Sequence, residues 1–348
     1  MTQSPALVSL ATSVPAYRFT QDQVTAWARE CFGARVADFE RLAPAFANAG
    51  IATRHSCVPL AWYSQPHDWP ERTRLYIDQS LALLEQAALA CLDRVGLTVE
   101  AVDAVVTVSS TGIATPTLDA RLAQRLRMRS DLERLPIFGL GCAGGALGLA
   151  RAAALTRARP GARVLLLVVE LCGLTFRAID VSKSNVIAAA LFGDGAAAAL
   201  IQTGGDGPVL GPAGDYTWPD SLDVMGWEVA PDGLAVMFSR DIPTLVRERL
   251  APALDAFLGR HALSRHALDG FIVHPGGAKV LSALEAVFEL PFGGLDDARA
   301  VLRDYGNMSA ATVLFVLRRA LDRGVRGLQL LTALGPGFTA GFQLLRAA

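Results

Sequence analysis

One cysteine stands at a turn whose surroundings would activate a thiol. Cys142 lies in the glycine-rich run 141–145, between a predicted buried strand and a predicted helix. The free N–H groups and the dipole at the start of a helix stabilise a thiolate. We also expect Gly144 and Gly145 to let backbone donors approach a bound carbonyl group. The pattern predicts a nucleophile, and the alternative is a buried, inert cysteine of the core.

A histidine and an asparagine occupy turns of the same kind in the second half of the chain. His274 follows the apolar run 271–273 and precedes a Pro-Gly-Gly turn, at the strand end where open α/β sheets bind ligands. It could hold the Cys142 thiolate as an ion pair and later donate to a developing oxyanion. Asn307 precedes a predicted helix, where the alternatives are a helix N-cap and a second oxyanion donor.

These turns need a scaffold that brings distant segments together. Short apolar runs alternate with longer Ala/Leu-rich stretches, which predicts a mostly parallel sheet covered on both faces. The two halves look alike, so we expect an N-terminal half, residues 1–205, and a C-terminal half, residues 206–348, fused into one globular unit. The predicted strands are 101–108, 136–140, 163–170, 196–202, 268–273, 327–334 and a last strand to 345; the predicted helices end near 158, 258, 288 and 323.

Composition excludes several classes of protein. The 348 residues include 32 basic and 33 acidic ones, for a net charge of −1, so no field favours nucleic acid. A hydrophobic fraction of 52% argues against global disorder. No run approaches the ~20 apolar residues of a membrane helix. The five cysteines form no C-x-x-C pair, so we expect no metal site and a reduced, cytoplasmic protein.

Five ordered motifs make the pattern specific, because together they resemble the type III polyketide synthases, the chalcone synthase family. The resemblance implies a thiolase-type αβαβα fold, a homodimer and no cofactor. It implies that an acyl starter from acyl-CoA is held on Cys142 and extended with malonyl-CoA, with His274 and Asn307 as partners of the thiol. The motifs are Gly-Leu-Gly-Cys142-Ala-Gly-Gly, Leu191-Phe192-Gly193-Asp194-Gly195-Ala196, Ile272-Val273-His274-Pro275-Gly276-Gly277, Tyr305-Gly306-Asn307-Met308-Ser309 and Leu334-Gly335-Pro336-Gly337.

The same resemblance implies a cavity and its entrance. Phe192 matches the aromatic gate between the CoA tunnel and the cavity, and Val236 takes the place of a second family phenylalanine. Arg54 and Lys279 are the candidates for binding CoA, although Lys279 could equally be a solvated helix residue. Further positions implied at the cavity or its rim are Cys172, Thr175, Ser309, Gly335 and Thr115, the last in a Thr-Pro dipeptide that the family usually holds cis at the dimer interface.

Softer similarities point to one branch and leave alternatives open. The segments 225–227, 234–236 and 239–243 resemble the bacterial enzymes that make alkylpyrones and alkylresorcinols. A long acyl starter would need an apolar channel past Cys172, unless Cys172 simply packs at a strand end. The other hypotheses are a ketoacyl-acyl-carrier-protein synthase III, whose histidine usually begins a His-Gln-Ala-Asn motif, and a non-catalytic partner subunit, which would have lost its nucleophile.

Overall fold

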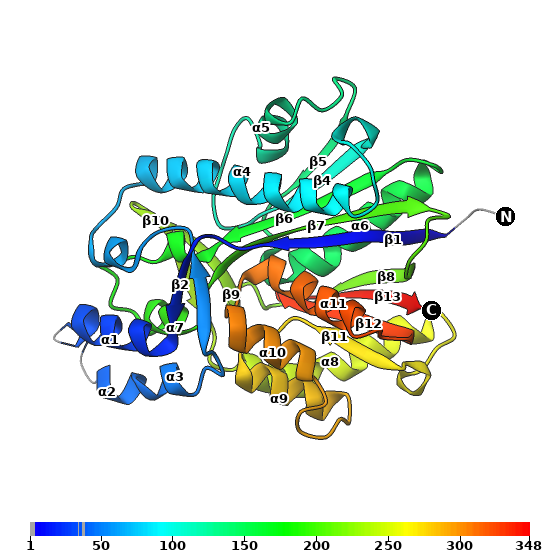
Figure 1. Ribbon diagram of the computed structural model, residues 1–348. Helices are drawn as coiled ribbons and strands as arrows, with labels where there is room; N and C mark the ends of the chain where they lie inside the picture. Colours follow the sequence, from blue (N-terminus) through cyan, green and yellow to red (C-terminus); the bar gives the residue numbers. More distant parts are fainter. Residues whose placement is uncertain (1–3, 34, 37–38) are drawn as a thin grey trace.

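A nine-stranded sheet forms the centre of the molecule. The computed structural model describes residues 4–33, 35–36 and 39–348 (Figure 1). Within them the strand order is β11-β12-β13-β8-β1-β7-β6-β4-β5. The strands are β1 (Pro5–Ser13), β4 (Ala104–Val108), β5 (Glu133–Ile137), β6 (Val164–Leu171), β7 (Asp194–Thr203), β8 (Val209–Thr217), β11 (Gly270–Val273), β12 (Gly327–Gly335) and β13 (Thr339–Ala347).

The two ends of this sheet repeat one arrangement. On one side β4 and β6 run parallel, and β7 and β1 follow antiparallel; on the other side β11, β12, β13 and β8 repeat these directions. The halves meet where β1 pairs with β8 at Ala6 and Val209. The boundary at residues 205 and 206, in the loop before β8, stays a prediction.

The expectation of a mostly parallel sheet is wrong. Five of the eight pairings in the described sheet are antiparallel. Strands buried on both faces are continuous apolar runs in either direction, so composition does not report strand direction. The short connection between β12 and β13 requires an antiparallel pair, because a parallel pair needs a long crossover.

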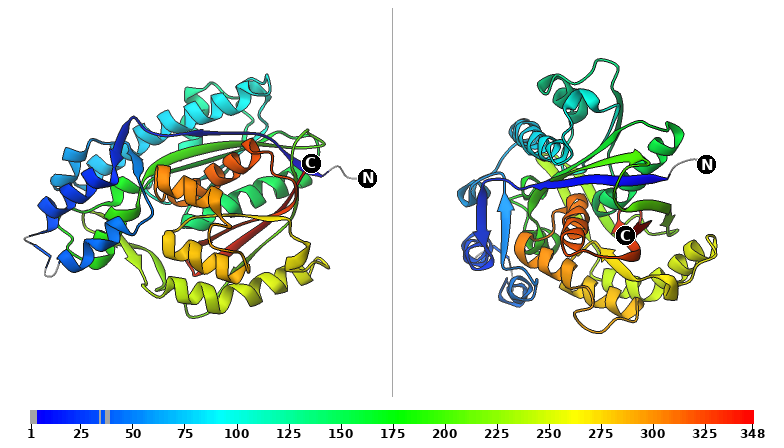
Figure 2. Two further views of the ribbon diagram at one scale, coloured as in Figure 1. Left: turned by 60° about the horizontal axis from the view of Figure 1, so that its bottom comes forward. Right: turned by 45° about the vertical axis from the view of Figure 1, so that its right-hand side comes forward.

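Helices cover both outer faces of the fold and also form its middle layer. Helix α6 packs against β6, β4, β7, β12 and β13, and α11 packs beside it, so these two helices separate the halves of the sheet (Figure 2). On the outer faces α4 covers β1, β6 and β7, and Phe257 of α8 stacks on Phe342 of β13. These layers confirm the thiolase-type αβαβα fold. The helices are α1 (Gln21–Phe32), α2 (Phe39–Leu42), α3 (Pro44–Ala47), α4 (Trp69–Asp93), α5 (Leu118–Arg125), α6 (Gly144–Ala158), α7 (Lys183–Leu191), α8 (Ile242–Gly259), α9 (Ala278–Val287), α10 (Asp296–Tyr305) and α11 (Thr312–Asp322).

Helix α6 is buried along most of its length, and its first glycines explain how it fits. A Cβ at Gly145 would overlap the carbonyl oxygen of Ala310, and a Cβ at Gly144 would lie 2.7 Å from Val108 Cγ1. These glycines therefore have a packing role, and the expectation that they admit backbone donors to a ligand stays a prediction. They let α6 approach β4 and the turn before α11.

Two small antiparallel sheets lie at the edge of the central layers. One pairs β2 (Tyr17–Thr20) with β3 (Thr53–Ser56), which helices α1 to α3 separate in the chain, and the other is a hairpin of β9 (Met225–Ala230) and β10 (Gly233–Phe238). The β9–β10 hairpin lies against α7 (Figure 1). Within the described residues, no helix has the length and apolar character needed to cross a membrane.

Candidate active site

Three turns far apart in the sequence converge on one cavity. Cys142 precedes α6, His274 follows β11, and Asn307 lies between α10 and α11. All three line a cavity of about 480 Å³, which we call the thiol cavity. The structure therefore brings together the three residues that the sequence predicted to act together.

Cys142 is held in a short 3₁₀ turn that runs directly into α6. Its Sγ lies 3.5 Å from the hydroxyl oxygen of Ser309. Burial raises the pKa of Cys142 to about 11, and the nearby carboxylate of Glu170 also raises it, whereas the Ser309 hydrogen bond lowers it. The thiol is therefore protonated at neutral pH and needs a base to become a nucleophile.

The backbone around Cys142 is fixed from two sides. The Ser110 hydroxyl oxygen accepts hydrogen bonds from the N–H groups of Gly139 and Gly141, at 3.2 and 3.1 Å. On the other side Gly335 lies so close that a Cβ there would overlap Leu140 O and come within 2.8 Å of Ala143 N. Gly335 thus acts on the site by supporting the turn, while Ser309 lies at the sulfur itself.

His274 supplies an uncommitted imidazole. It is 4% exposed, and neither ring nitrogen has a hydrogen-bond partner among the described residues. Burial lowers the pKa of His274 to about 3, so the ring is neutral at physiological pH. Cys142 and His274 both line the thiol cavity, and the ion pair between them stays a prediction. Both nitrogens remain open to substrate and to the thiol proton.

Asn307 holds its own turn and reaches the thiol cavity. Its Oδ1 accepts a hydrogen bond from the backbone N–H of Ser309 at 2.8 Å, which closes an Asx turn. The helix N-cap that the sequence offered as one alternative is wrong, because Met308 and Ala311 precede the two helical segments that follow and neither position has a side-chain cap. The Nδ2 of Asn307 donates to Gly276 O at 3.2 Å, and both residues line the thiol cavity. Because the turn uses the oxygen, the amide N–H₂ keeps a donor for a ligand.

Glu170 is a buried acid behind the thiol that sequence reasoning missed. Its Oε2 accepts hydrogen bonds from Ser110 N at 3.0 Å and from the Thr111 hydroxyl at 2.8 Å. Its Oε1 has no partner among the described residues, and burial raises the pKa of Glu170 to about 7. Glu170 ends a predicted strand, and no spacing signal connects it with Cys142.

Phe192 lines a second space, and the residue before it, Leu191, lines the thiol cavity. Backbone hydrogen bonds join this segment to the turn of Asn307: Asn307 N donates to Leu191 O at 2.9 Å and Gly193 N donates to Asn307 O at 3.0 Å. The second space is a smaller apolar pocket of about 50 Å³, which we call the deep pocket. Its lining includes three more of the implied cavity residues, Cys172, Thr175 and Val236.

Arg54 does not lie where the resemblance suggested. It is 5% exposed, and its guanidinium donates to the carbonyl oxygens of Ala189 and Phe192, at 2.8 and 2.9 Å, and to that of Ala190, at 2.6 Å. It also donates to Gln21 Oε1. The cation thus satisfies the last carbonyls of α7, where the helix dipole favours positive charge. Arg54 supports the gate from behind and is not available to CoA.

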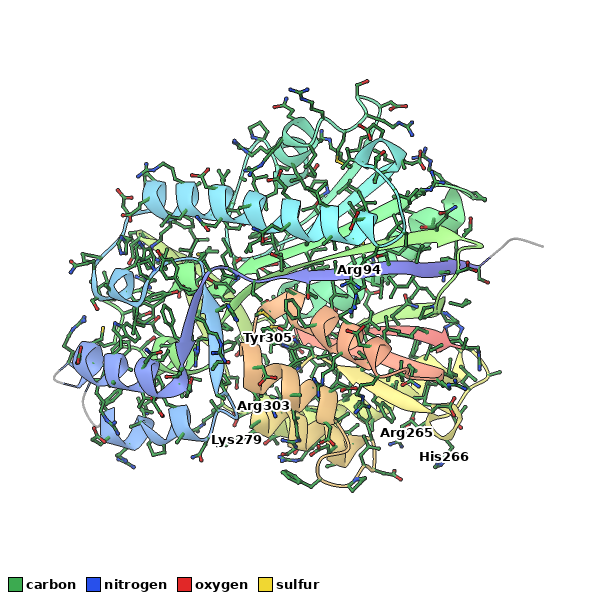
Figure 3. The ribbon with its side chains drawn as sticks, in the orientation of Figure 1. Arg94, Arg265, His266, Lys279, Arg303 and Tyr305 are labelled. Atoms are coloured by element: carbon green, nitrogen blue, oxygen red, sulfur yellow. The ribbon has the colours of Figure 1, made fainter. Side chains whose placement is uncertain are left out.

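The cations at the thiol cavity come from other segments. Lys279, at the start of α9, is exposed and lines this cavity (Figure 3). Two residues that sequence reasoning missed, Arg41 and Arg240, line it as well and are also exposed. Arg240 lies 4.0 Å from Asp241, a weak, solvated pair. Only their meeting in three dimensions identifies these cations, since Arg41 and Arg240 are 199 positions apart in the sequence.

Thr115 lies outside both spaces in this chain. It is exposed in the loop before α5, and the Thr115–Pro116 peptide is cis, as the resemblance implied. Among the described residues no group of three His, Cys, Asp or Glu side chains is arranged to hold a metal ion.

Two family models together match most of the chain. Residues 66–206 match the N-terminal domain of chalcone and stilbene synthases, and residues 212–348 match their C-terminal domain. A Bacillus subtilis (strain 168) protein, described provisionally as a chalcone synthase, is 40% identical over 96% of both chains. The 1,3,6,8-tetrahydroxynaphthalene synthase of Streptomyces peucetius subsp. caesius is 39% identical over 98% of this chain and 92% of that protein.

Solved structures give the same answer and decide between the hypotheses. The crystal structure of the 1,3,6,8-tetrahydroxynaphthalene synthase of Streptomyces coelicolor superposes with a TM-score of 0.91, at 30% identity, over 98% of this chain and 99% of that one. Matches to both domains favour a polyketide synthase over a ketoacyl-acyl-carrier-protein synthase III. They also identify an acyltransferase of CoA thioesters, which needs no further cofactor, rather than a non-catalytic subunit. The chain belongs to the chalcone and stilbene synthase family, the type III polyketide synthases.

Proposed function

We propose that Cys142 takes an acyl group from acyl-CoA with His274 as its base. The thiol is protonated at neutral pH, and the neutral imidazole has a free nitrogen to accept its proton. The sulfur then attacks the thioester carbonyl, and the proton passes from His274 to the departing CoA sulfur. The observation that carries this proposal is the presence of Cys142, His274 and Asn307 on the wall of one cavity.

The same residues serve the extension step. When malonyl-CoA loses CO₂, the electron pair of the broken bond forms an enolate whose charge lies on the thioester oxygen. Asn307 Nδ2 and an N–H of His274 are donors that stabilise this charge. The enolate carbon attacks the acyl group on Cys142, and the sulfur leaves as a thiolate. The CoA phosphates are held by the exposed cations Arg41, Arg240 and Lys279.

The starter we propose is a fatty acyl-CoA, and the product an alkylpyrone or alkylresorcinol. The support is the apolar lining of the deep pocket, where Val24, Leu60 and Phe176 accompany Cys172 and Val236. Each buried CH₂ contributes roughly 0.8 kcal/mol, so an oily chain is favoured there. The similarity to the tetrahydroxynaphthalene synthases supports a second candidate, a hydroxylated naphthalene without an alkyl chain. The small size of the deep pocket, about 50 Å³, favours that candidate.

One experiment separates the two products. Purified protein is incubated with malonyl-CoA alone and with malonyl-CoA plus acyl-CoAs of increasing length, and products are identified by mass. Preference for long acyl-CoAs supports the first candidate, and Cys172→Phe should then shorten the accepted starter while the size-matched Cys172→Ser does not. A single naphthalene product from malonyl-CoA alone, with every acyl-CoA refused, would replace it by the second.

We also propose a homodimer in the cytoplasm. The edge strand β5 is exposed, and three apolar side chains lie on or beside it: Ile113 is 51% exposed, Leu135 41% and Phe138 57%. An open strand edge with apolar side chains is a surface that proteins normally cover. Thr115 follows Ile113 closely and would reach the partner from there. The five free cysteines support a reducing compartment.

A further inference from the structure

The β9–β10 hairpin stands at the boundary between the thiol cavity and the deep pocket. Phe192 lines the deep pocket and Phe238 lines the thiol cavity. Their ring centroids are 5.6 Å apart, with an angle of 56° between the rings. Trp227 approaches Phe192 from the other strand, at 6.1 Å. Three aromatic rings therefore meet at a hairpin that contributes side chains to both spaces.

The strand register explains how this cluster replaces the missing phenylalanine. Alternate residues of a strand project from the same face, so Val236 and Phe238 of β10 face the same side. Trp227 is the cross-strand partner of Val236 in the antiparallel pair, and directly paired residues share a face. The aromatic surface lost at Val236 is thus supplied by its partner across the hairpin and by the next residue on its own face.

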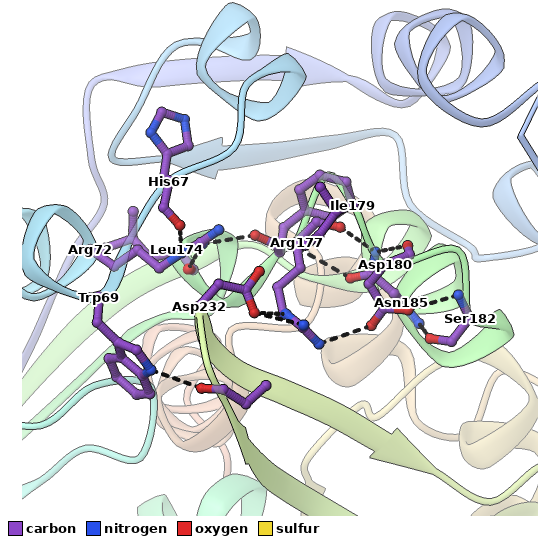
Figure 4. Close-up of polar contacts among 12 residues, drawn as sticks. His67, Trp69, Arg72, Leu174, Arg177, Ile179, Asp180, Ser182, Asn185 and Asp232 are labelled. Carbon is purple, nitrogen blue, oxygen red and sulfur yellow. Dashed lines mark hydrogen bonds and ion pairs between the residues drawn. The ribbon is translucent and has the colours of Figure 1, made fainter.

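The tip of the hairpin is fixed to the rest of the protein. Arg177 Nε donates to Asp232 Oδ1 at 2.6 Å, and Trp69 Nε1 donates to Ala230 O at 2.9 Å (Figure 4). The Arg177 side chain is 14% exposed and the Asp232 side chain 23%. Because solvent screens this ion pair only partly, it holds the turn more firmly than an exposed pair would.

The same network holds the opposite wall of the deep pocket. Arg72 Nη1 donates to the carbonyl oxygens of Leu174 and Phe176, at 2.5 and 2.8 Å (Figure 4). Those residues belong to the segment that carries Cys172 and Thr175 into the pocket. The hairpin and this segment are therefore tied to one another through α4 and the residues that follow Thr175.

We propose that Phe238 and Trp227 form, with Phe192, an aromatic partition that controls passage from the thiol cavity to the deep pocket, and that the Arg177–Asp232 ion pair positions it. Phe238 and Trp227 are then specificity-determining residues for the length of the chain that is carried on Cys142. Asp232 is a positioning residue that acts through the hairpin. This use of the partition rests on the proposed function, whereas the partition itself can be tested without catalysis.

The first test measures access to the deep pocket by chemical labelling. Cys172 lines that pocket, while Cys91 is buried in α4 and lines neither space, so it reports general opening of the fold. In a Cys142→Ser background, iodoacetamide modification of each cysteine is followed by mass spectrometry. Phe238→Ala should raise the rate at Cys172 by at least about tenfold, which corresponds to ~1.4 kcal/mol of barrier, with Cys91 unchanged.

The matched control is Met237→Ala, which truncates the neighbouring side chain on the opposite face of β10 and should leave both rates as they are. An unchanged Cys172 rate in Phe238→Ala would overturn the partition whatever the enzyme makes. Faster labelling of Cys91 together with Cys172 would also overturn it, because the fold rather than the passage would then have opened.

The second test measures product length in the active enzyme. Phe238→Ala and Asp232→Asn should both move the distribution of accepted starters, or of extensions from malonyl-CoA alone, towards longer chains, and Asp232→Glu should restore it in part. If the wild-type protein makes no polyketide, the proposed function is refuted, whereas the labelling result still tests the partition. Normal polyketides with an unchanged length distribution in both variants would refute the specificity role alone.

Discussion

Asn307 permits a clean separation of catalysis from folding, because its two roles use different atoms. The side-chain oxygen of Asn307 accepts a hydrogen bond from the backbone N–H of Ser309, and the side-chain nitrogen is the proposed oxyanion donor. Asn307→Asp keeps an oxygen for the Ser309 N–H and replaces the donor by an acceptor. Asn307→Ala removes both. The pair of variants therefore isolates the donor.

The expected magnitudes differ between the two variants. Loss of one oxyanion donor typically lowers the rate by ~10²–10³, or about 2.7–4 kcal/mol of transition-state stabilisation. Both variants should lose this much in malonyl-CoA decarboxylation, and Asn307→Asp somewhat more, because its charge repels the enolate. Loss of the Asn307 oxygen leaves the buried N–H of Ser309 without its partner, which should lower the free energy of unfolding by roughly 1–3 kcal/mol in Asn307→Ala only.

Three measurements check this. Release of labelled CO₂ from malonyl-CoA gives the decarboxylation rate, and single-turnover transfer from an acyl-CoA gives the loading rate. Urea denaturation gives the stability of each variant. If Asn307→Asp decarboxylates malonyl-CoA within about threefold of wild type, far short of the loss expected for a missing donor, then the amide nitrogen does not stabilise the enolate. Asn307 would then only stabilise its own turn.

Three further variants test the surroundings of the site. Glu170→Gln removes a negative charge that raises the pKa of Cys142, so that pKa should fall and alkylation of Cys142 at pH 8 should become severalfold faster; an unchanged rate would refute the coupling. In the wild-type protein the raised pKa of Glu170 means that the folded state holds this proton more tightly than the unfolded state. The wild-type protein should therefore lose stability as the pH rises from 4.5 to about 7, and Glu170→Gln should not show this loss. Gly335→Ala should press on Ala143, cost ~1–3 kcal/mol by overpacking and slow the loading of Cys142; full loading would show that the turn yields freely. Leu135→Lys should convert a dimer into monomers in light scattering, and a wild-type monomer at micromolar concentration would contradict the proposed dimer.

The three candidate catalytic residues could be singled out because their signal is local. Cys142, His274 and Asn307 each stand at a glycine-containing turn where a strand or helix ends, and chain geometry at such turns depends on a few neighbouring residues. Their meeting in one cavity then follows from the repetition of the same strand order in both halves. The long helix α4 also has local signals, since Asp68 caps it and Pro70 lies in its first turn.

Strand direction and the roles of buried groups were not predictable in the same way. The apolar runs that became β6 and β7 look alike whether they pair parallel or antiparallel. The sequence suggested that Gly144 and Gly145 admit backbone donors to a ligand, and only the packing of Ala310 and Val108 shows that they also admit neighbouring elements. Spacing assigned the place of the second family phenylalanine to Val236, and the position of Phe238 beside it depends on the register of β10 with β9, which the sequence does not state.

Arg54 shows most clearly why charge in a sequence does not identify a ligand. The sequence does not distinguish an exposed arginine at a tunnel mouth from a buried one. Whether the guanidinium can bind a ligand depends on the groups that surround it. Here desolvation lowers the pKa of Arg54 to about 10, and the buried Asp194 partly opposes that change. The group therefore stays charged at neutral pH, and burying it is tolerable only because the carbonyls of α7 replace its water. Because Arg54 would lose these hydrogen bonds if it moved, it is a fixed support for the backbone of Phe192. Arg54 therefore helps to set the position of the Phe192 gate, in addition to the β9–β10 hairpin that contacts the ring.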